Sequence, residues 1–103
     1  MEELIKEVTK FRDERDWKKF HTPKNLAISL AIEASELLEI FQWTFDDELD
    51  EVVKLKRSEI EEEIADVLIY LLLLADALKI DLKESFFKKM KKNERRYPIE
   101  RQR

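Results

Sequence analysis

Apolar residues recur along the chain at spacings of three and four, which is the repeat of one face of an α-helix. Glycine is absent and the helix-forming residues Leu, Glu, Lys and Ala are abundant, so the sequence predicts an all-α fold. Helices are expected at residues 2–19, 23–43, 59–79 and 82–96. Residues 44–50, "TFDDELD", are expected to form a connector or a short helical turn.

Local signals mark where the predicted helices begin. Thr22 is a natural N-cap, and Pro23 suits the first helical position. Ser58 followed by Glu61 matches a capping box at the start of the third helix. Asp81 is the expected cap of the fourth helix.

The end of the last helix sets the predicted domain boundary. Pro98 is expected to stop the helix, because proline disfavours the helical conformation in the residue before it. A chain of 103 residues suggests one domain. We therefore predict a single all-α domain over residues 1–98 and a frayed tail at residues 99–103.

The two central helices, residues 23–43 and 59–79, are apolar around most of their circumference. Such helices are normally buried on all sides, and 103 residues are too few to enclose two of them. The sequence therefore predicts a four-helix-bundle protomer that assembles as a homo-oligomer.

The composition excludes several kinds of site. Without glycine there is no Gly-rich phosphate loop, and without cysteine there is no thiol nucleophile or cysteine-based metal site. His21 is the single histidine, so one chain cannot form a multi-histidine metal site. Acidic and basic residues are interspersed at a net charge of −4, which gives no polybasic surface for nucleic acid.

The sequence carries no membrane signal. The N-terminal residues "MEELIKEVTKF" are charged, unlike those of a signal peptide. The longest apolar run, "VLIYLLLLA", is much shorter than the ~20 residues that cross a bilayer. We expect a cytoplasmic protein with no membrane partner.

Two carboxylate pairs interrupt the apolar central helices. Glu33 and Glu36 are three residues apart and therefore lie on one helix face. Glu63 and Asp66 repeat this spacing, so antiparallel packing would bring four acids together. Ionised carboxylates near a core need positive charge, and the adjacent helix positions are not basic. A divalent cation with oxygen ligands fits, with Mg²⁺ as the default and Mn²⁺ as a substitute.

Spacing and context leave a solvated acidic face as the alternative, because such pairs arise freely in a chain with 24 acidic residues. A di-iron bundle is disfavoured, since it requires Glu-x-x-His pairs and His21 precedes the second helix.

Aromatic residues flank the second helix, with Trp17 and His21 before it and Trp43 at its end. Mg²⁺ suggests a phosphate-bearing substrate, and aromatic faces stack on nucleobases. The alternative is that the tryptophans close the ends of the core. A basic group near the end of the fourth helix is either a set of phosphate ligands or a solvated face; it comprises Lys89, Lys92, Arg95 and Arg96.

Three segments, "DWKKFHTPKNLAISLAIEASELLEIFQW", "EEIADVLIYLLLLADALKIDL" and "KMKKNERRYP", resemble the MazG-like all-α nucleotide pyrophosphohydrolases. Within that family the chain looks most similar to the dCTP pyrophosphatase type, and the resemblance spans residues 16–98. It implies cleavage of a nucleoside triphosphate between the α and β phosphates, which yields a monophosphate and pyrophosphate. It also implies assembly as a homodimer or as a homotetramer built of dimers.

The resemblance assigns roles to particular residues. It implies Mg²⁺ binding by the four acids Glu33, Glu36, Glu63 and Asp66. It implies a nucleotide site formed by Trp17, His21, Asn25, Trp43, Tyr70, Lys89 and Asn93.

We hypothesise that Glu36 or Glu63 orients the attacking water or accepts its proton. The short charged loop after the second helix leaves the base preference open. Two other functions stay open: a phosphoribosyl-ATP pyrophosphohydrolase, which the tryptophan pair disfavours, and a non-catalytic helical interaction module.

Overall fold

The computed structural model describes residues 1–100, and the regular elements of this part of the chain are all helices, without a strand. The five α-helices are α1 (Glu2–Glu14), α2 (Pro23–Phe41), α3 (Leu49–Leu55), α4 (Arg57–Ala77) and α5 (Leu82–Arg96). Two 3-10 turns, η1 (Lys18–Phe20) and η2 (Asp46–Glu48), precede α2 and α3. The predicted all-α class is confirmed, whereas the predicted number of helices is too low by one because residues 49–55 form α3.

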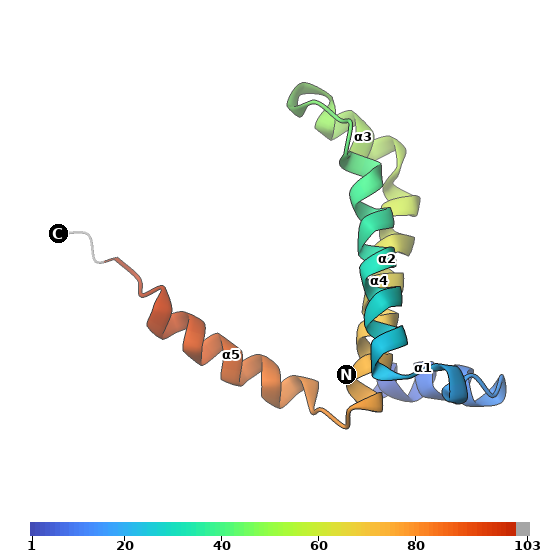
Figure 1. Ribbon diagram of the computed structural model, residues 1–103. Helices are drawn as coiled ribbons and strands as arrows, with labels where there is room; N and C mark the ends of the chain where they lie inside the picture. The colour runs from blue at the N-terminus through green and yellow to red at the C-terminus, as the bar shows by residue number, and fades with distance from the viewer. Residues whose placement is uncertain (101–103) are drawn as a thin grey trace.

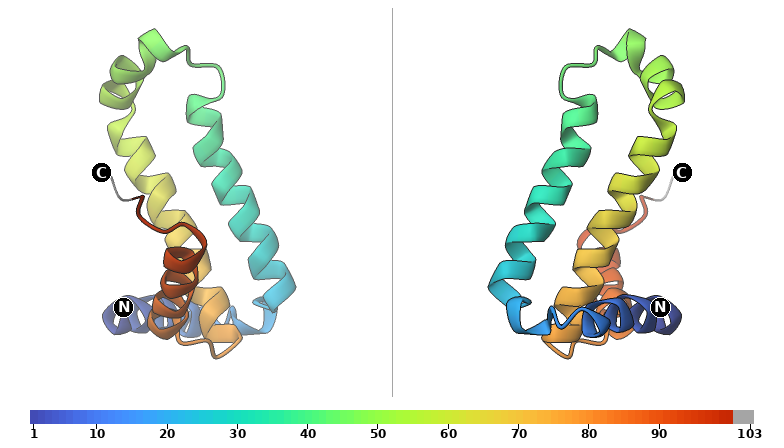
Figure 2. Two further views of the ribbon diagram at one scale, coloured as in Figure 1. Left: turned by 90° about the vertical axis from the view of Figure 1, so that its left-hand side faces the viewer. Right: turned by 90° about the vertical axis from the view of Figure 1, so that its right-hand side faces the viewer.

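The core is an antiparallel pair formed by α2 and α4, which lie side by side along their length (Figures 1 and 2). Helix α1 packs across one end of this pair, and α3 lies at the other end. The buried apolar side chains come from the pair itself: Leu26, Ile40, Leu72, Leu73 and Ala75. The two most apolar helices therefore form the scaffold on which α1 and α3 pack.

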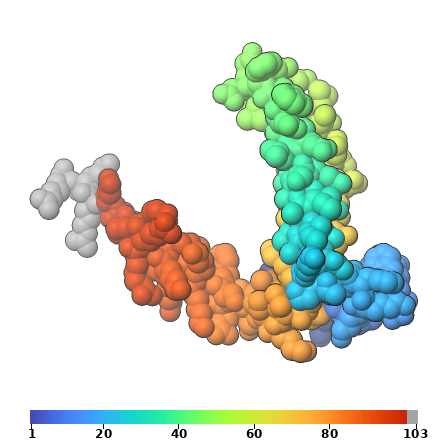
Figure 3. Space-filling view, viewed as in Figure 1, coloured from blue at the N-terminus to red at the C-terminus, as the bar shows by residue number. Residues whose placement is uncertain are grey.

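Helix α5 leaves the end of α4 and extends away from the pair as a separate arm (Figures 1 and 3). The radius of gyration is 17.5 Å, compared with about 13 Å for a compact domain of this length. The prediction of a four-helix-bundle protomer is therefore wrong. Leu38, Phe86 and Phe87 each expose more than half of their surface, so the protomer leaves large apolar side chains uncovered.

Two predicted helix caps are confirmed. The Thr22 hydroxyl accepts a hydrogen bond from the backbone N–H of Asn25 at 3.1 Å, with Pro23 in the first turn of α2. An Asp81 carboxylate oxygen accepts from the backbone N–H of Glu84 at 3.0 Å, and α5 spans the predicted residues. Because these caps satisfy backbone donors at the helix starts, they fix where α2 and α5 begin.

The predicted capping box at Ser58 does not form. Helix α4 begins at Arg57, which places Ser58 inside the first turn, and its N-cap Lys56 makes no side-chain cap hydrogen bond. Glu61 instead accepts a hydrogen bond from Arg57 at 3.2 Å, as an i,i+4 pair on the helix surface. Helix α3 ends at Leu55, so the chain enters α4 directly and has no extended cap residue there.

Two helices end earlier than predicted because each closes with a left-handed residue. Asp16 and Lys79 both have a φ of 55°. At the end of α1 the N–H of Trp17 donates to the carbonyl of Arg12 at 3.1 Å. The same bond at the end of α4 joins Ile80 to Ala75 at 2.9 Å. These are Schellman closures, formed here without glycine. Helix α2 also ends two residues before the predicted position, at Phe41, but its C-cap residue Gln42 has a φ of −52°.

A buried ion pair ties α1 to α4. Arg12 is only 5% exposed, and its Nη1 donates to an Asp76 carboxylate oxygen at 2.8 Å. Its Nε donates to Asp13 at 2.9 Å. The Trp17 N–H that closes α1 bonds the carbonyl of the same arginine. Arg12 therefore sets the position of α1 and of the turn that follows it.

The predicted frayed tail lies partly outside the described residues, because residues 101–103 are not among them. Ile99 follows α5 without helical structure and is 94% exposed. Within residues 1–100, none of the helices has the length and apolar character needed to cross a membrane.

We expect Asp76→Asn to lower the free energy of unfolding by about 1–3 kcal/mol, because it weakens a charge-assisted hydrogen bond to a buried guanidinium. Urea unfolding of the variant and the wild type measures this difference. Asp16→Asn is the matched control. It removes the exposed pair with Lys19 and should change stability by less than about 1 kcal/mol. Equal effects of the two substitutions would contradict a structural role for the buried pair.

Candidate metal centre and adjoining clefts

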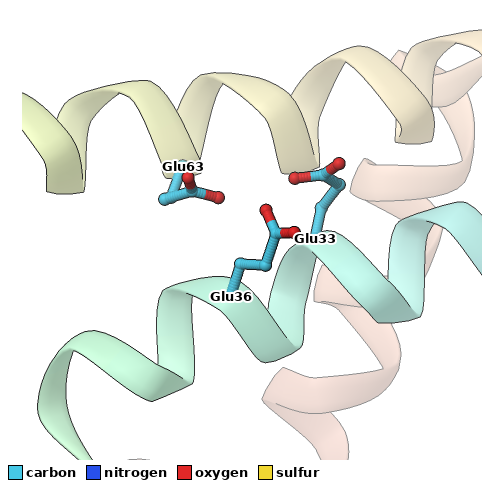
Figure 4. Close-up of side chains that lie close together, drawn as sticks. All are labelled: Glu33, Glu36 and Glu63. Atoms are coloured by element: carbon cyan, nitrogen blue, oxygen red, sulfur yellow. The ribbon is translucent and has the colours of Figure 1, made fainter.

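Three carboxylates converge in the gap between α2 and α4. Glu33 and Glu36 extend from α2 and Glu63 extends from α4, and the three side chains point toward one another (Figure 4). One oxygen from each lies within 4.8 Å of the others. Antiparallel packing of the two apolar helices produces this arrangement, because it brings the middle of α2 against the first half of α4.

The donor set fits a hard divalent cation. The Oε2 atoms of Glu33 and Glu63 are buried and have no hydrogen-bond partner among the described residues. A buried charged oxygen without a partner is unfavourable unless a counter-ion or a proton satisfies it. Three carboxylate oxygens at this separation are suitable ligands for Mg²⁺ or Mn²⁺, which prefer oxygen donors.

The electrostatics of the cluster favour protonation when no cation is bound. Burial raises the pKa of Glu33 from its ordinary value of 4.5 to about 7, and the hydrogen bond and negative charge of Glu36 add to this shift. Burial also raises the pKa of Glu63, again with a contribution from the negative charge of Glu36. A bound cation would reverse both shifts by stabilising the ionised forms.

Asp66 lies apart from this group. It follows Glu63 by three residues on α4, yet its oxygens are not within the 4.8 Å cluster. Its negative charge still contributes to the raised pKa values of Glu33 and Glu63. Asp66 lines the neighbouring cleft, so it stands between the three-carboxylate cluster and the aromatic residues.

An aromatic cleft of about 330 Å³ adjoins the acids, where α1 and the η1 segment meet α4. Its walls include Trp17 and His21, whose ring centroids are 6.3 Å apart, and Tyr70 of α4. Phe11, which also lines the cleft, packs edge-on against Trp17 with a centroid distance of 5.6 Å. The cleft therefore offers flat apolar surfaces next to a carboxylate site.

His21 retains unused hydrogen-bonding capacity in this cleft. Its Nδ1 atom is buried and has no partner among the described residues. Burial lowers the pKa of His21, and the positive charge of Arg12 lowers it further. The imidazole is therefore neutral at pH 7 and can donate one hydrogen bond to a polar ligand and accept another from it.

Other residues named from the sequence lie elsewhere in the protomer. Trp43 follows the C-terminal end of α2 and is 83% exposed, whereas Trp17 precedes the N-terminal end of this helix. Lys89 and Asn93 are on the diverging arm α5 and line neither cleft beside the acids. The Asn25 side chain donates to the carbonyl of Phe20 at 3.1 Å, which holds η1 against the start of α2.

The match to a known protein family covers the carboxylate part of the site. The MazG-like family model matches residues 28–103, which is most of the chain. The chain belongs to the MazG-like family. The family match includes the carboxylates of both α2 and α4, while the Trp17 and His21 side of the cleft lies before its first residue.

Curated relatives of this MazG-like chain include two proteins named dCTP pyrophosphatase 1. The one from Bos taurus is 40% identical over 96% of the chain, and the one from Homo sapiens is 41% identical over 95%. The chain spans about 60% of the length of these relatives. A solved structure titled as a pyrophosphatase, from Archaeoglobus fulgidus DSM 4304, is 58% identical with a TM-score of 0.91. That match covers 96% of this chain and 93% of the other.

The structure of this MazG-like protein also reveals residues that the sequence analysis missed. A second cleft, of about 370 Å³, lies on the opposite side of the acids and is lined in part by Glu39, Lys56 and Glu59. Lys56 and Glu59 precede Glu63 by seven and four residues, so helical spacing could have placed them on the same face. Arg12 had no comparable signal, because its burial depends on Asp76, 64 residues away.

Because the pKa of Glu33 is raised, the free energy of unfolding of the protein without bound metal depends on pH. Between its ordinary value of 4.5 and about 7, the folded MazG-like protein holds a proton that the unfolded chain has released. The Glu33 contribution is therefore fully present below pH 4.5 and is lost as the pH rises through about 7. In EDTA, we expect the stability of Glu33→Gln relative to the wild type to increase across this interval.

Urea unfolding of both proteins in EDTA at several pH values measures this difference. Excess Mg²⁺ should stabilise the wild type above pH 7 more than the variant. A difference that stays constant over the pH range would show that Glu33 is not protonated in the folded state.

Proposed function

We propose that this chain hydrolyses a nucleoside triphosphate, preferably dCTP-like, to the monophosphate and pyrophosphate with Mg²⁺ as cofactor. The observation that carries the proposal is the position of the three-carboxylate cluster next to an aromatic cleft. The relatives support the same reading, since they are named as pyrophosphatases and the curated ones as dCTP pyrophosphatases. Mn²⁺ is the proposed substitute ion.

The proposed binding mode follows from the order of the features along α4. The nucleobase stacks in the cleft between Trp17 and Tyr70, where aromatic faces exclude water. The neutral His21 ring supplies a hydrogen bond to a polar edge of the base or sugar. The triphosphate then crosses the acids, which places its α phosphate near Glu36 and Glu63.

A divalent cation held by Glu33, Glu36 and Glu63, with the negative charge of Asp66 nearby, would neutralise phosphate charge and increase the acidity of water. Glu36 and Glu63 face the cluster from opposite helices, so either can orient a water for attack on phosphorus and accept its proton. The bond from phosphorus to the bridging oxygen breaks, and pyrophosphate leaves with the electron pair. Helices α2 and α4 hold the acids fixed during this step, because both are packed in the core.

We expect Glu36→Gln to reduce turnover at least about 100-fold while the helical circular dichroism is retained, because one proton acceptor and one cation ligand are lost. Glu48→Gln in η2 is the matched control, since this acid lines neither cleft. The assay follows a panel of nucleoside triphosphates and phosphoribosyl-ATP with Mg²⁺, and it identifies the products. Orthophosphate as the primary product, or normal turnover by Glu36→Gln, would contradict the proposal.

The proposed enzyme is a homodimer or homotetramer. The protomer leaves apolar side chains of α2, α4 and α5 exposed and has no compact shape of its own. Packing of α5 from one copy against the α2–α4 pair of another would bury these surfaces. It would also bring Lys89 and Asn93 toward the phosphates of a neighbouring site. A contact between copies would likewise place the exposed Trp43 at a neighbouring substrate site.

We expect the double variant Phe86→Glu, Phe87→Glu to sediment as a monomer while the wild type sediments as a dimer or tetramer. The two rings are exposed in the protomer and form an edge-on pair with centroids 5.2 Å apart. Charges at both positions would oppose burial in an interface. Lys91→Glu, on the same helix, is the control for a charge change alone. A monomeric wild type would disprove the proposed assembly.

A further inference from the structure

The second cleft contains one basic side chain among acids. Its lining residues are Glu36, Glu39, Ile40, Lys56, Glu59 and Glu63. Two of these, Glu36 and Glu63, also belong to the three-carboxylate cluster, so the cleft opens directly onto that cluster. Lys56 is therefore the basic side chain that lines this cleft.

Lys56 is held by its backbone, while its ammonium group is unpaired. Its N–H donates to the carbonyl of Val52 and its carbonyl accepts from the N–H of Ile60, each at 2.9 Å. These bonds fix it at the junction of α3 and α4. Within residues 1–100 no carboxylate lies within 4.0 Å of its ammonium nitrogen, although acids line the same cleft. The positive charge is therefore available to a ligand.

The two clefts lie on opposite sides of the acids along α4. Tyr70 of the aromatic cleft follows Glu63 by seven residues, and Lys56 precedes Glu63 by seven. Each separation is about two helical turns, or roughly 10.5 Å. A nucleotide with its base in the aromatic cleft and its α phosphate at the acids therefore directs its terminal phosphates into the second cleft.

We propose that Lys56 binds the terminal phosphate of the substrate and, after cleavage, the pyrophosphate product; this inference rests on the proposed function. A phosphate in this cleft would face Glu39 and Glu59 as well as the cluster acids, so it needs a cation beyond those held by the carboxylates. Lys56 meets this need with three N–H donors on a flexible stem. Lys56 would also favour nucleoside triphosphates, which have a third phosphate to place in this cleft, over nucleoside diphosphates.

The test compares Lys56→Gln with the wild type in the presence of Mg²⁺. We expect binding of inorganic pyrophosphate, measured by isothermal titration calorimetry, to weaken about 10- to 100-fold, which corresponds to one charge-assisted hydrogen bond. Binding of the nucleoside monophosphate should change less than about twofold. The preference for triphosphate over diphosphate in kcat/KM should fall by a similar factor to pyrophosphate binding.

Matched variants separate this role from a general charge effect. Lys54→Gln removes an exposed lysine of α3 outside the cleft and should leave pyrophosphate binding unchanged. Lys56→Arg retains the charge and should restore most of the affinity. Unchanged pyrophosphate binding by Lys56→Gln, or equal weakening of pyrophosphate and monophosphate, would overturn the proposal. A wild type that binds pyrophosphate but hydrolyses no triphosphate would refute the proposed function instead, and the binding comparison would still decide the role of Lys56.

Discussion

The repulsion among the carboxylates between α2 and α4 is the constraint on which the site depends. The two helices pack through Leu26, Ile40 and Leu72, and this packing forces Glu33, Glu36 and Glu63 into one small volume. Without a counter-ion, burial and mutual charge raise the pKa of Glu33 to about 7. The packed pair thus holds an unfavourable electrostatic arrangement that a divalent cation would relieve, so cation binding and stability would be coupled.

The elements around this pair serve to place chemistry on either side of the acids. On one side, the Arg12 ion pair and the left-handed closure at Asp16 turn the chain so that Trp17 and His21 face α4. On the other side, α3 and its junction place Lys56 beside Glu63. Aromatic surface, carboxylates and ammonium therefore follow one another along α4, which is the order that the proposed function requires for the base, α phosphate and terminal phosphate of a nucleotide.

Features set by neighbouring residues could be predicted from the sequence, and features set by distant contacts could not. Thr22 and Asp81 cap their helices through bonds to residues three positions away, so both starts were predictable. The convergence of Glu33 with Glu63 followed from apolar periodicity and antiparallel packing. The ends of α1 and α4 were not predictable, because Asp16 and Lys79 occupy a conformation that glycine normally marks. The burial of Arg12 also had no local signal, since its partner Asp76 is distant in sequence.

The shape of the protomer could not be predicted either, because a local sequence pattern does not specify which surface covers an apolar helix face. The apolar faces of α2, α4 and α5 predict burial, but they do not specify whether the covering surface belongs to the same chain. The structure places α5 away from the pair, so its exposed Phe86 and Phe87 and the exposed Trp43 have no cover within the described residues. In the proposed oligomer, association would complete both the core and the substrate site. Under the proposed function, folding, assembly and nucleotide binding would form one linked equilibrium, in which α5 of each copy would cover the α2–α4 pair of another.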